Sequence, residues 1–128
     1  ENFTKEKNFK SYKSIEEFFK HEKDTNVDLF YASHSIEHVN NLHYYIKLFK
    51  QMKCQFFIEV PNCSNNQSGN KFPAGGYNGK IVVPHTYYFT SNFFYNNFQI
   101  EKLELVRDNS FVDHKDDADA IIAVGRFS

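Results

Sequence analysis

The sequence has no tryptophan, one methionine, three prolines and only two cysteines among its 128 residues. Cys54 and Cys63 are too few for the disulfide framework of a small secreted domain, so we expect reduced thiols in a cytosolic protein. No apolar run approaches the ~20 residues of a membrane span, and no signal peptide is visible. The formal net charge of -1 supplies no field for a nucleic-acid backbone or an anionic membrane, so neither is an expected partner.

Aromatic side chains are abundant instead. Phe and Tyr make up 18% of the residues, within a hydrophobic content of 41%. A chain of 128 residues can bury one core but not two, so we expect a single domain over residues 1–128 with a core rich in rings. Residues 63–84 are polar and bear several glycines, which indicates a long loop within that domain. Long loops inside compact domains are often functional.

The hydrophobic pattern predicts an alternation of strands and helices. Ser14 and Glu17 form an S-x-x-E capping box, which predicts a helix as far as His21. Two further helices are expected, one ending near Gln51 and one over residues 92–97. This order predicts the α/β class, with a parallel sheet, helices on its faces and a terminal antiparallel strand pair. Strands are expected over residues 8–12, 27–32, 54–60, 98–106 and 120–127.

The same spacing predicts which side chains are buried. Ile15, Phe18 and Phe19 recur at helical spacing and should form the buried side of the first helix. The strand at residues 27–32 is nearly continuous in apolar residues, which is typical of a parallel strand covered on both faces. In the helical segment after that strand, Glu37 is expected to reach water.

Three stretches of the sequence are similar to the class I S-adenosylmethionine-dependent methyltransferase family. Residues 27–39 resemble the family's fourth strand and the helix after it, which carries a Glu-His pair. Residues 57–62 resemble its fifth strand, and residues 84–90 resemble the segment before the last helix and the final two strands. The stretches occur in the family's order, and the resemblance covers roughly residues 8–127.

The resemblance implies a Rossmann-like sheet with strand order 3-2-1-4-5-7-6. In this scheme residues 8–12 are the third strand, and the other expected strands are the fourth to the seventh. Strands one and two are absent from this chain, so the sheet is incomplete, with strands three to seven present. Missing N-terminal residues, a second copy or another partner would complete it. The family also usually has a glycine turn before strand five, where this chain has residues 51–53.

The implied activity is methyl transfer from the cofactor S-adenosylmethionine to a small-molecule or sugar acceptor. The chain has no G-x-G-x-x-G turn after a strand, the segment that lies against the amino-acid end of this cofactor. The alternative is therefore a catalytically inactive methyltransferase-like module that serves binding or assembly. A sheet that lacks its centre would expose an edge that pairs with another chain.

By family position, four residues border the cofactor. Ser33 and His34 follow the fourth strand and are expected beside the methionine part, unless Ser33 only caps the next helix. Ser14 and Ile15 follow the third strand and are expected near the adenine, although the capping box explains Ser14 equally well.

Two histidines are candidates for catalysis. His85 lies near the acceptor pocket by family position, and a histidine with a pKa of ~6.5 can remove a proton from a hydroxyl group. The alternative is a loop histidine that hydrogen-bonds the backbone. His38 belongs to the Glu-His pair and is either catalytic or a structural hydrogen-bonding residue.

A zinc-dependent hydrolase is the third hypothesis. His34, Glu37 and His38 match the pattern H-x-x-E-H, which on a helix would put both histidines on one face as metal ligands. That class of enzyme needs a further carboxylate ligand, and the apolar strand directly before the pattern fits the methyltransferase better. Cys54, which flanks a strand, is expected to be a small buried hydrophobic residue rather than a ligand.

Overall fold

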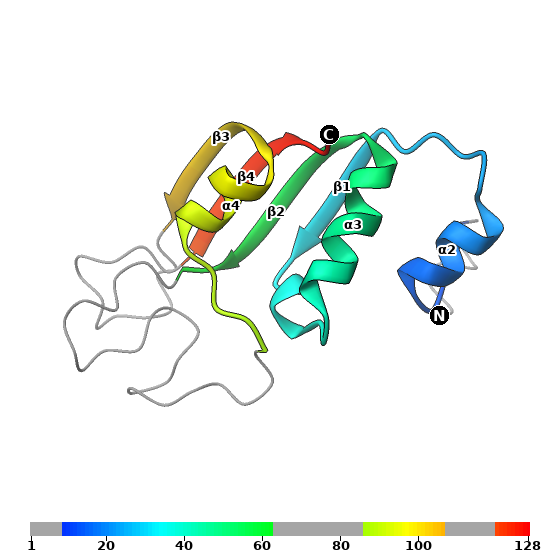
Figure 1. Ribbon diagram of the computed structural model, residues 1–128, viewed down its shortest axis with the longest axis horizontal. Helices are drawn as coiled ribbons and strands as arrows, with labels where there is room; N and C mark the ends of the chain where they lie inside the picture. Colours follow the sequence, from blue (N-terminus) through cyan, green and yellow to red (C-terminus); the bar gives the residue numbers. More distant parts are fainter. Residues whose placement is uncertain (1–8, 63–85, 107–119) are drawn as a thin grey trace.

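The computed structural model describes residues 9–62, 86–106 and 120–128, which form an α/β arrangement of one sheet with helices (Figure 1). The predictions for Cys63, His85 and the loop at 63–84 lie outside these residues. The helical elements are α2 (Ile15–His21), the short 3-10 helix η1 (Ile36–His38), α3 (Leu42–Met52) and α4 (Ser91–Asn97). The strands are β1 (Leu29–Ser33), β2 (Gln55–Pro61), β3 (Gln99–Val106) and β4 (Ala120–Arg126).

The four strands form one mixed sheet in the order β1-β2-β4-β3. β1 and β2 are parallel, with register from Leu29 opposite Gln55 to Ser33 opposite Glu59. β2 is antiparallel to β4, and β4 is antiparallel to β3. The predicted terminal antiparallel pair is confirmed, whereas the predicted parallel sheet is reduced, in the described residues, to the single pair of β1 and β2.

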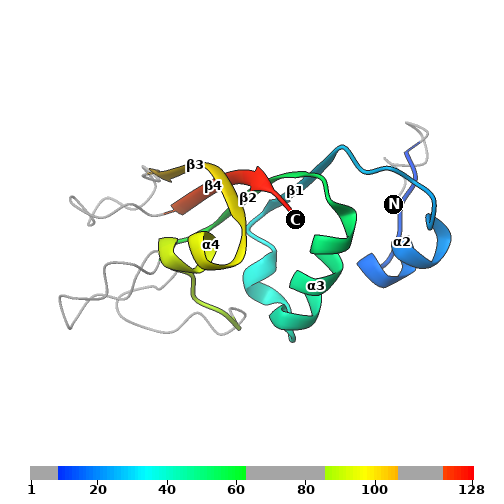
Figure 2. The ribbon, with the colours of Figure 1, turned by 45° about the horizontal axis from the view of Figure 1, so that its top comes forward.

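Helices α3 and α4 cover the same face of the sheet, as Figure 2 shows from the side. Phe56, Ile58 and Val60 of β2 point to this face and are completely buried. Phe127, just after β4, stacks on Phe56 with ring centroids 4.7 Å apart and contacts the ring of Phe98 at 5.4 Å. The core is therefore rich in rings, as the composition predicts.

The opposite face of the sheet is not covered by any described helix. The expectation that residues 27–32 are covered on both faces is wrong here, because Leu29 is 56% and Tyr31 is 65% exposed. Tyr31 stacks on the half-buried Phe57 of β2, with ring centroids 5.3 Å apart. Alternate side chains of β1 point to opposite faces, so covering one face leaves Leu29 and Tyr31 in water.

The strand predicted at residues 8–12 is wrong for its described part, since residues 9–12 form no strand. A strand needs a neighbour for its backbone hydrogen bonds, and the outer edge of β1 pairs with no described strand. The segment runs beside α2 instead. There Lys10 and Tyr12 both donate hydrogen bonds to the carboxylate of Glu22, the Lys10 Nζ atom at 2.6 Å.

Helix α2 begins where the capping box predicts. Ser14 Oγ accepts a hydrogen bond from the backbone N–H of Glu17 at 3.1 Å, and the Glu17 carboxylate accepts one from the N–H of Lys13 at 2.6 Å. The observed burial of this helix is weaker than predicted. Ile15, Phe18 and Phe19 are only half-buried, and no residue of α2 is fully buried.

Helix α3 is bounded by two identifiable caps. Asn41 begins it, its side chain accepting from the N–H of Tyr44 at 3.2 Å, and Lys53 ends it with φ 49°, in the left-handed region. Lys53 thus adopts the conformation expected of the glycine turn that the resemblance places before this strand. Cys54 follows at 3% exposure, which confirms its predicted burial, and that burial raises the pKa of its thiol.

Gly125 of β4 is required by close packing. A Cβ atom there would lie 2.1 Å from the carbonyl oxygen of Gln99 and 2.9 Å from the ring of Phe56. No helix in the described part of the chain is long and apolar enough to cross a membrane.

Candidate functional site

Two of the four predicted cofactor residues, Ser33 and His34, lie at the carboxyl end of β1, one of the two parallel strands. Ser33 is the last residue of β1, and it is opposite Glu59 near the end of β2. In open α/β sheets, ligands bind outside the carboxyl ends of the strands, because the loops there are free to form a crevice. This edge of the sheet is the candidate site.

Ser33 and His34 both contact Glu59. Ser33 Oγ donates a hydrogen bond to Glu59 Oε2 at 3.0 Å, and His34 Nε2 lies 3.4 Å from Glu59 Oε1. The backbone N–H of His34 also donates to the carbonyl oxygen of Glu59 at 2.9 Å. The end of β1 is therefore tied to β2 by main chain and side chain together.

His34 has an uncommon backbone conformation. Its φ of 47° is in the left-handed region, which non-glycine residues with bulky side chains rarely adopt. The side chain is 52% exposed, so the imidazole stands at the surface of the edge. Conformations of this kind persist where surrounding contacts hold them, and they are frequent at functional sites.

Glu37 is the central finding at this edge, because it is fully buried where the sequence predicts contact with water. Its Oε1 atom lies 3.7 Å from His34 Nδ1 and 3.6 Å from His38 Nε2, and neither carboxylate oxygen has a hydrogen bond within the described part of the chain. The expectation failed because η1 is a single 3-10 turn, so a helical wheel does not describe its side chains. A buried carboxylate without a hydrogen bond is costly, which makes it a candidate for ligand binding.

The described segment that begins at Thr86 lies at this edge. The backbone N–H groups of Thr86 and Tyr87 donate to the carbonyl oxygen of Glu37 at 2.8 and 3.1 Å. Three residues along, Phe89 forms a parallel bridge with Asn62, the buried residue that follows β2. Residues 86–89 are therefore held beside the ends of β1 and β2, and Glu37 joins the two parts.

The structure brings some of the predicted residues together and leaves others apart. Ser33, His34 and His38 lie in one cluster around Glu37 and Glu59. The alternative that Ser33 caps a helix is wrong, because Ser33 belongs to β1, and the next helical elements, η1 and α3, have Ser35 and Asn41 at their N-caps.

Ser14 and Ile15 do not join this cluster by any hydrogen bond or ion pair of the described residues. Both lie at the start of α2, which Figure 1 shows beyond α3 at the far side of the molecule from α4. The side chain of Ser14 serves the helix cap. Their proposed place near an adenine therefore stays a prediction.

The arrangement does not match the geometry that the zinc hypothesis assumes. His34 lies in a bend before η1 and has a left-handed backbone, so His34 and His38 are not on one face of an α-helix. In residues 9–62, 86–106 and 120–128, no three His, Cys, Asp or Glu side chains are grouped to hold a metal ion.

Glu59 belongs to the candidate site, although the sequence analysis did not predict it there. It belongs to the stretch that resembles the fifth strand, but no role follows from that position alone. The available signal was an acidic residue at the carboxyl end of an otherwise apolar strand. Such a residue is directed towards the same edge as Ser33, as the register confirms.

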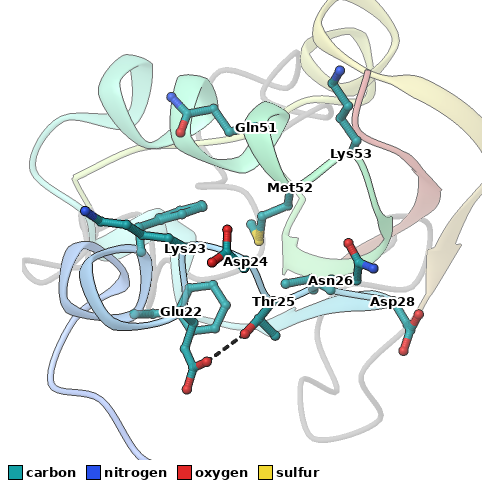
Figure 3. Close-up of a pocket in the computed structure, with 12 residues that line it drawn as sticks. Glu22, Lys23, Asp24, Thr25, Asn26, Asp28, Gln51, Met52 and Lys53 are labelled. Atoms are coloured by element: carbon teal, nitrogen blue, oxygen red, sulfur yellow. Dashed lines mark hydrogen bonds between the residues drawn. The ribbon is translucent and has the colours of Figure 1, made fainter.

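A separate cavity of about 550 Å³ lies between α2 and the end of α3 (Figure 3). It is next to Asp28, at the amino end of β1, so it is at the opposite end of this strand from Ser33. Glu22 on its wall already accepts hydrogen bonds from Lys10 and Thr25, each at 2.6 Å, and from Tyr12. These donors lower the pKa of Glu22 to about 2.

The edge formed by β1, β2 and residues 86–89 therefore has the chemistry of a ligand site. It combines two carboxylates, two histidines and a serine hydroxyl at the ends of parallel strands. Comparison with protein-family models, with curated proteins and with solved structures finds no match to this chain.

Proposed function

We propose that this chain forms the strand-four to strand-seven half of a class I S-adenosylmethionine-dependent methyltransferase, with the cofactor at the carboxyl ends of β1 and β2. The observation that carries the proposal is the sheet order. β1-β2-β4-β3, with β3 and β4 antiparallel, is the order 4-5-7-6 that the resemblance implies for these strands. A second observation supports the proposal: Lys53 has a left-handed backbone at the position where the family usually has a glycine turn.

The described residues fit the cationic end of S-adenosylmethionine. Its ammonium and sulfonium groups are positive, and Glu37 offers a buried carboxylate, with no hydrogen bond among the residues that the structure describes, beside the half-exposed Glu59. When bound, the cofactor supplies an electrophilic methyl group. A carboxylate in a water-poor site interacts strongly with a positive charge, which favours cofactor binding at this edge.

Each residue of the cluster has a role in this proposal. Ser33 and His34 border the cofactor, and the hydrogen bond from Ser33 orients Glu59. The Glu37 carboxylate, which also faces two histidines, meets the positive charge of the cofactor, and the Glu37 carbonyl oxygen holds Thr86. His38 is the described candidate for proton removal from an acceptor hydroxyl, and His85 stays a second candidate.

The expected contribution of these residues is alignment rather than covalent chemistry. Methyl transfer to a hydroxyl group needs the nucleophile in line with the methyl group and a base for the proton, and most of the rate comes from holding this geometry. A rigid edge tied across β1 and β2 meets this need.

Titration calorimetry of S-adenosylmethionine into the purified chain tests the proposal. We expect saturable binding, weakened at least ~5-fold in His34→Asn, the loss expected for one good polar contact. Asparagine tolerates the left-handed backbone, so the variant removes the imidazole without adding strain. Lys53→Asn is the matched control, because Lys53 is the other described non-glycine residue with positive φ. No saturable heat from wild type, or equal loss in both variants, contradicts the proposal.

The second candidate is an assembly module that pairs through β1, and one observation favours it. β1 has a free edge among the described strands, and its exposed Leu29 and Tyr31 lie beside that edge. If this candidate holds, sedimentation velocity detects self-association of the wild-type chain. Tyr31→Lys should abolish it, and Tyr95→Lys, at an exposed residue of α4, should leave it unchanged. A monomer at every concentration removes the candidate for pairing between copies.

A further inference from the structure

A second cavity, of about 330 Å³, lies on the helix-covered side of the sheet between α3, α4 and residues 86–89. Its volume is at the lower end of the range for small-molecule sites, which suggests a ligand of one ring. Leu42 and Ile46 of α3 form its aliphatic wall, and both are buried. The other walls are mainly aromatic.

The aromatic walls are held in place by contacts with one another and with the backbone around the start of α3. The hydroxyl group of Tyr87 accepts from the N–H of Leu42 at 3.2 Å and donates to the carbonyl oxygen of Asn40 at 3.3 Å, which fixes the ring. Phe89 is 2% exposed and meets Phe93 edge-to-face, with centroids 4.9 Å apart. The rings are therefore preorganised, and a flat aromatic guest could meet them in stacked or edge-to-face geometry.

Few polar groups face the cavity. Asn97 of α4 uses its side-chain N–H group to donate to the carbonyl oxygen of Phe93 at 2.7 Å, which leaves its Oδ1 atom as an acceptor. His43 of α3 is exposed at the rim. Tyr88 also lines the cavity and carries a further hydroxyl group, and the hydroxyl group of Tyr87 is already engaged by Leu42 and Asn40. The amide oxygen of Asn97 and the imidazole of His43 can satisfy a single hydroxyl group. A sugar would bring several hydroxyl groups into apolar walls with no partners, which is unfavourable.

The cavity adjoins the candidate site through Tyr87. The ring of Tyr87 lines the cavity, while its backbone N–H donates to the carbonyl oxygen of Glu37 at 3.1 Å. Together with Thr86, this residue connects the aromatic walls to the cluster at the strand ends. A ligand in the cavity would therefore contact Tyr87, whose backbone is hydrogen-bonded to Glu37.

We infer that this cavity binds the acceptor, and that the acceptor is a small aromatic compound with one hydroxyl group, of the phenol class. The role as acceptor rests on the proposed methyl transfer. The choice of a phenol over a sugar rests on the cavity alone: rings from residues 86–89 and α4, aliphatic side chains from α3, and one free amide oxygen.

Binding of 4-fluorophenol to the whole chain, followed by fluorine NMR, tests the inference without any cofactor. We expect saturable binding that Phe93→Leu weakens roughly 3-fold to 10-fold, the loss of one aromatic pair. Tyr95→Leu is the control, since Tyr95 is on the same helix, 58% exposed and not on the cavity wall. Absence of binding, equal loss in both variants, or equally strong competition by cyclohexanol overturns the inference.

A second variant keeps the test valid if Phe93→Leu fails to fold. Asn97→Ala should weaken 4-fluorophenol but leave fluorobenzene unchanged, because only the phenol hydroxyl meets the amide oxygen. Equal effects on both probes would contradict the proposed hydroxyl contact. Since neither probe needs S-adenosylmethionine, failure here is distinguishable from failure of cofactor binding in the calorimetric titration.

Discussion

The Oε1 atom of Glu37 lies 3.7 Å from the Nδ1 atom of His34, and the carboxylate that makes this contact is fully buried with no hydrogen bond from any described residue. A fold selected for stability alone would not favour this arrangement, since burial of an unsatisfied carboxylate opposes folding. We therefore infer that Glu37 lowers the stability of the fold and is kept because it contributes to function.

Replacing Glu37 with methionine should stabilise the chain and weaken ligand binding. Methionine has a similar length and no polar atom to satisfy, so we expect Glu37→Met to raise the free energy of unfolding by about 1–3 kcal/mol. Urea denaturation measures this. Glu59→Met is the control: Glu59 is partly exposed and hydrogen-bonded to Ser33, so no gain is expected there. A destabilised Glu37→Met variant would mean that the carboxylate is satisfied in solution.

Lys53→Gly should stabilise the chain. Lys53 ends α3 with φ 49°, a position where glycine avoids the strain of a Cβ atom. The strain removed is about 1–2 kcal/mol, and the greater entropy of an unfolded glycine offsets part of it. We therefore expect a net gain of about 0.5–1 kcal/mol in urea denaturation. An unchanged or lower midpoint would show that Lys53 is not left-handed in solution.

Gly125→Ala should be severely destabilising. The added Cβ would lie 2.1 Å from the carbonyl oxygen of Gln99, a backbone atom that cannot move without disturbing the pairing of β3 and β4. We expect a loss of about 3 kcal/mol or more. Val124→Ala, on the partly exposed face, should cost less than about 1.5 kcal/mol. Similar losses in both variants would contradict the register of this strand pair.

The stability of the chain should fall with acid in part through Glu22. Its pKa is lowered to about 2 by hydrogen bonds from Lys10, Thr25 and Tyr12, from an ordinary value of 4.5. Because the folded pKa is the lower one, this stabilisation is present above pH 4.5 and is lost as the pH falls towards 2.

Thermal unfolding between pH 6 and pH 2 measures this effect. Glu22→Gln should lower the melting temperature at pH 6 and should lose less stability than wild type as acid is added. Glu101→Gln, at an exposed residue of β3, is the control and should follow wild type. If Glu22→Gln keeps the wild-type acid dependence, its hydrogen bonds do not form in solution.

Local sequence patterns predicted most of the fold. The capping box at Ser14 located α2, and the apolar runs located the strands that begin at Leu29 and Gln55 to within about two residues. The helix cap and the strands depend on residues that are close in the sequence, so local patterns can predict them. The predicted strand at residues 8–12 failed because pairing depends on a neighbouring strand, which no local pattern reveals.

The candidate site was predicted only in part, for a related reason. Ser33 and His34 could be placed at a strand end from the sequence. The burial of Glu37 depends on a 3-10 turn and on the return of residues 86–89, and the role of Glu59 depends on the register between β1 and β2. These are long-range relationships, and the aromatic cavity at Tyr87 is another.

The most direct test of the proposed cofactor site is an NMR titration of the ¹⁵N-labelled chain with S-adenosylmethionine. The account predicts saturable shifts at Ser33, His34 and Glu37 and at the end of β2, and no shifts at Thr25 in the opposite cavity. Shifts confined to that opposite cavity, or no saturable shift at millimolar cofactor, would contradict the proposal that the carboxyl ends of β1 and β2 bind S-adenosylmethionine.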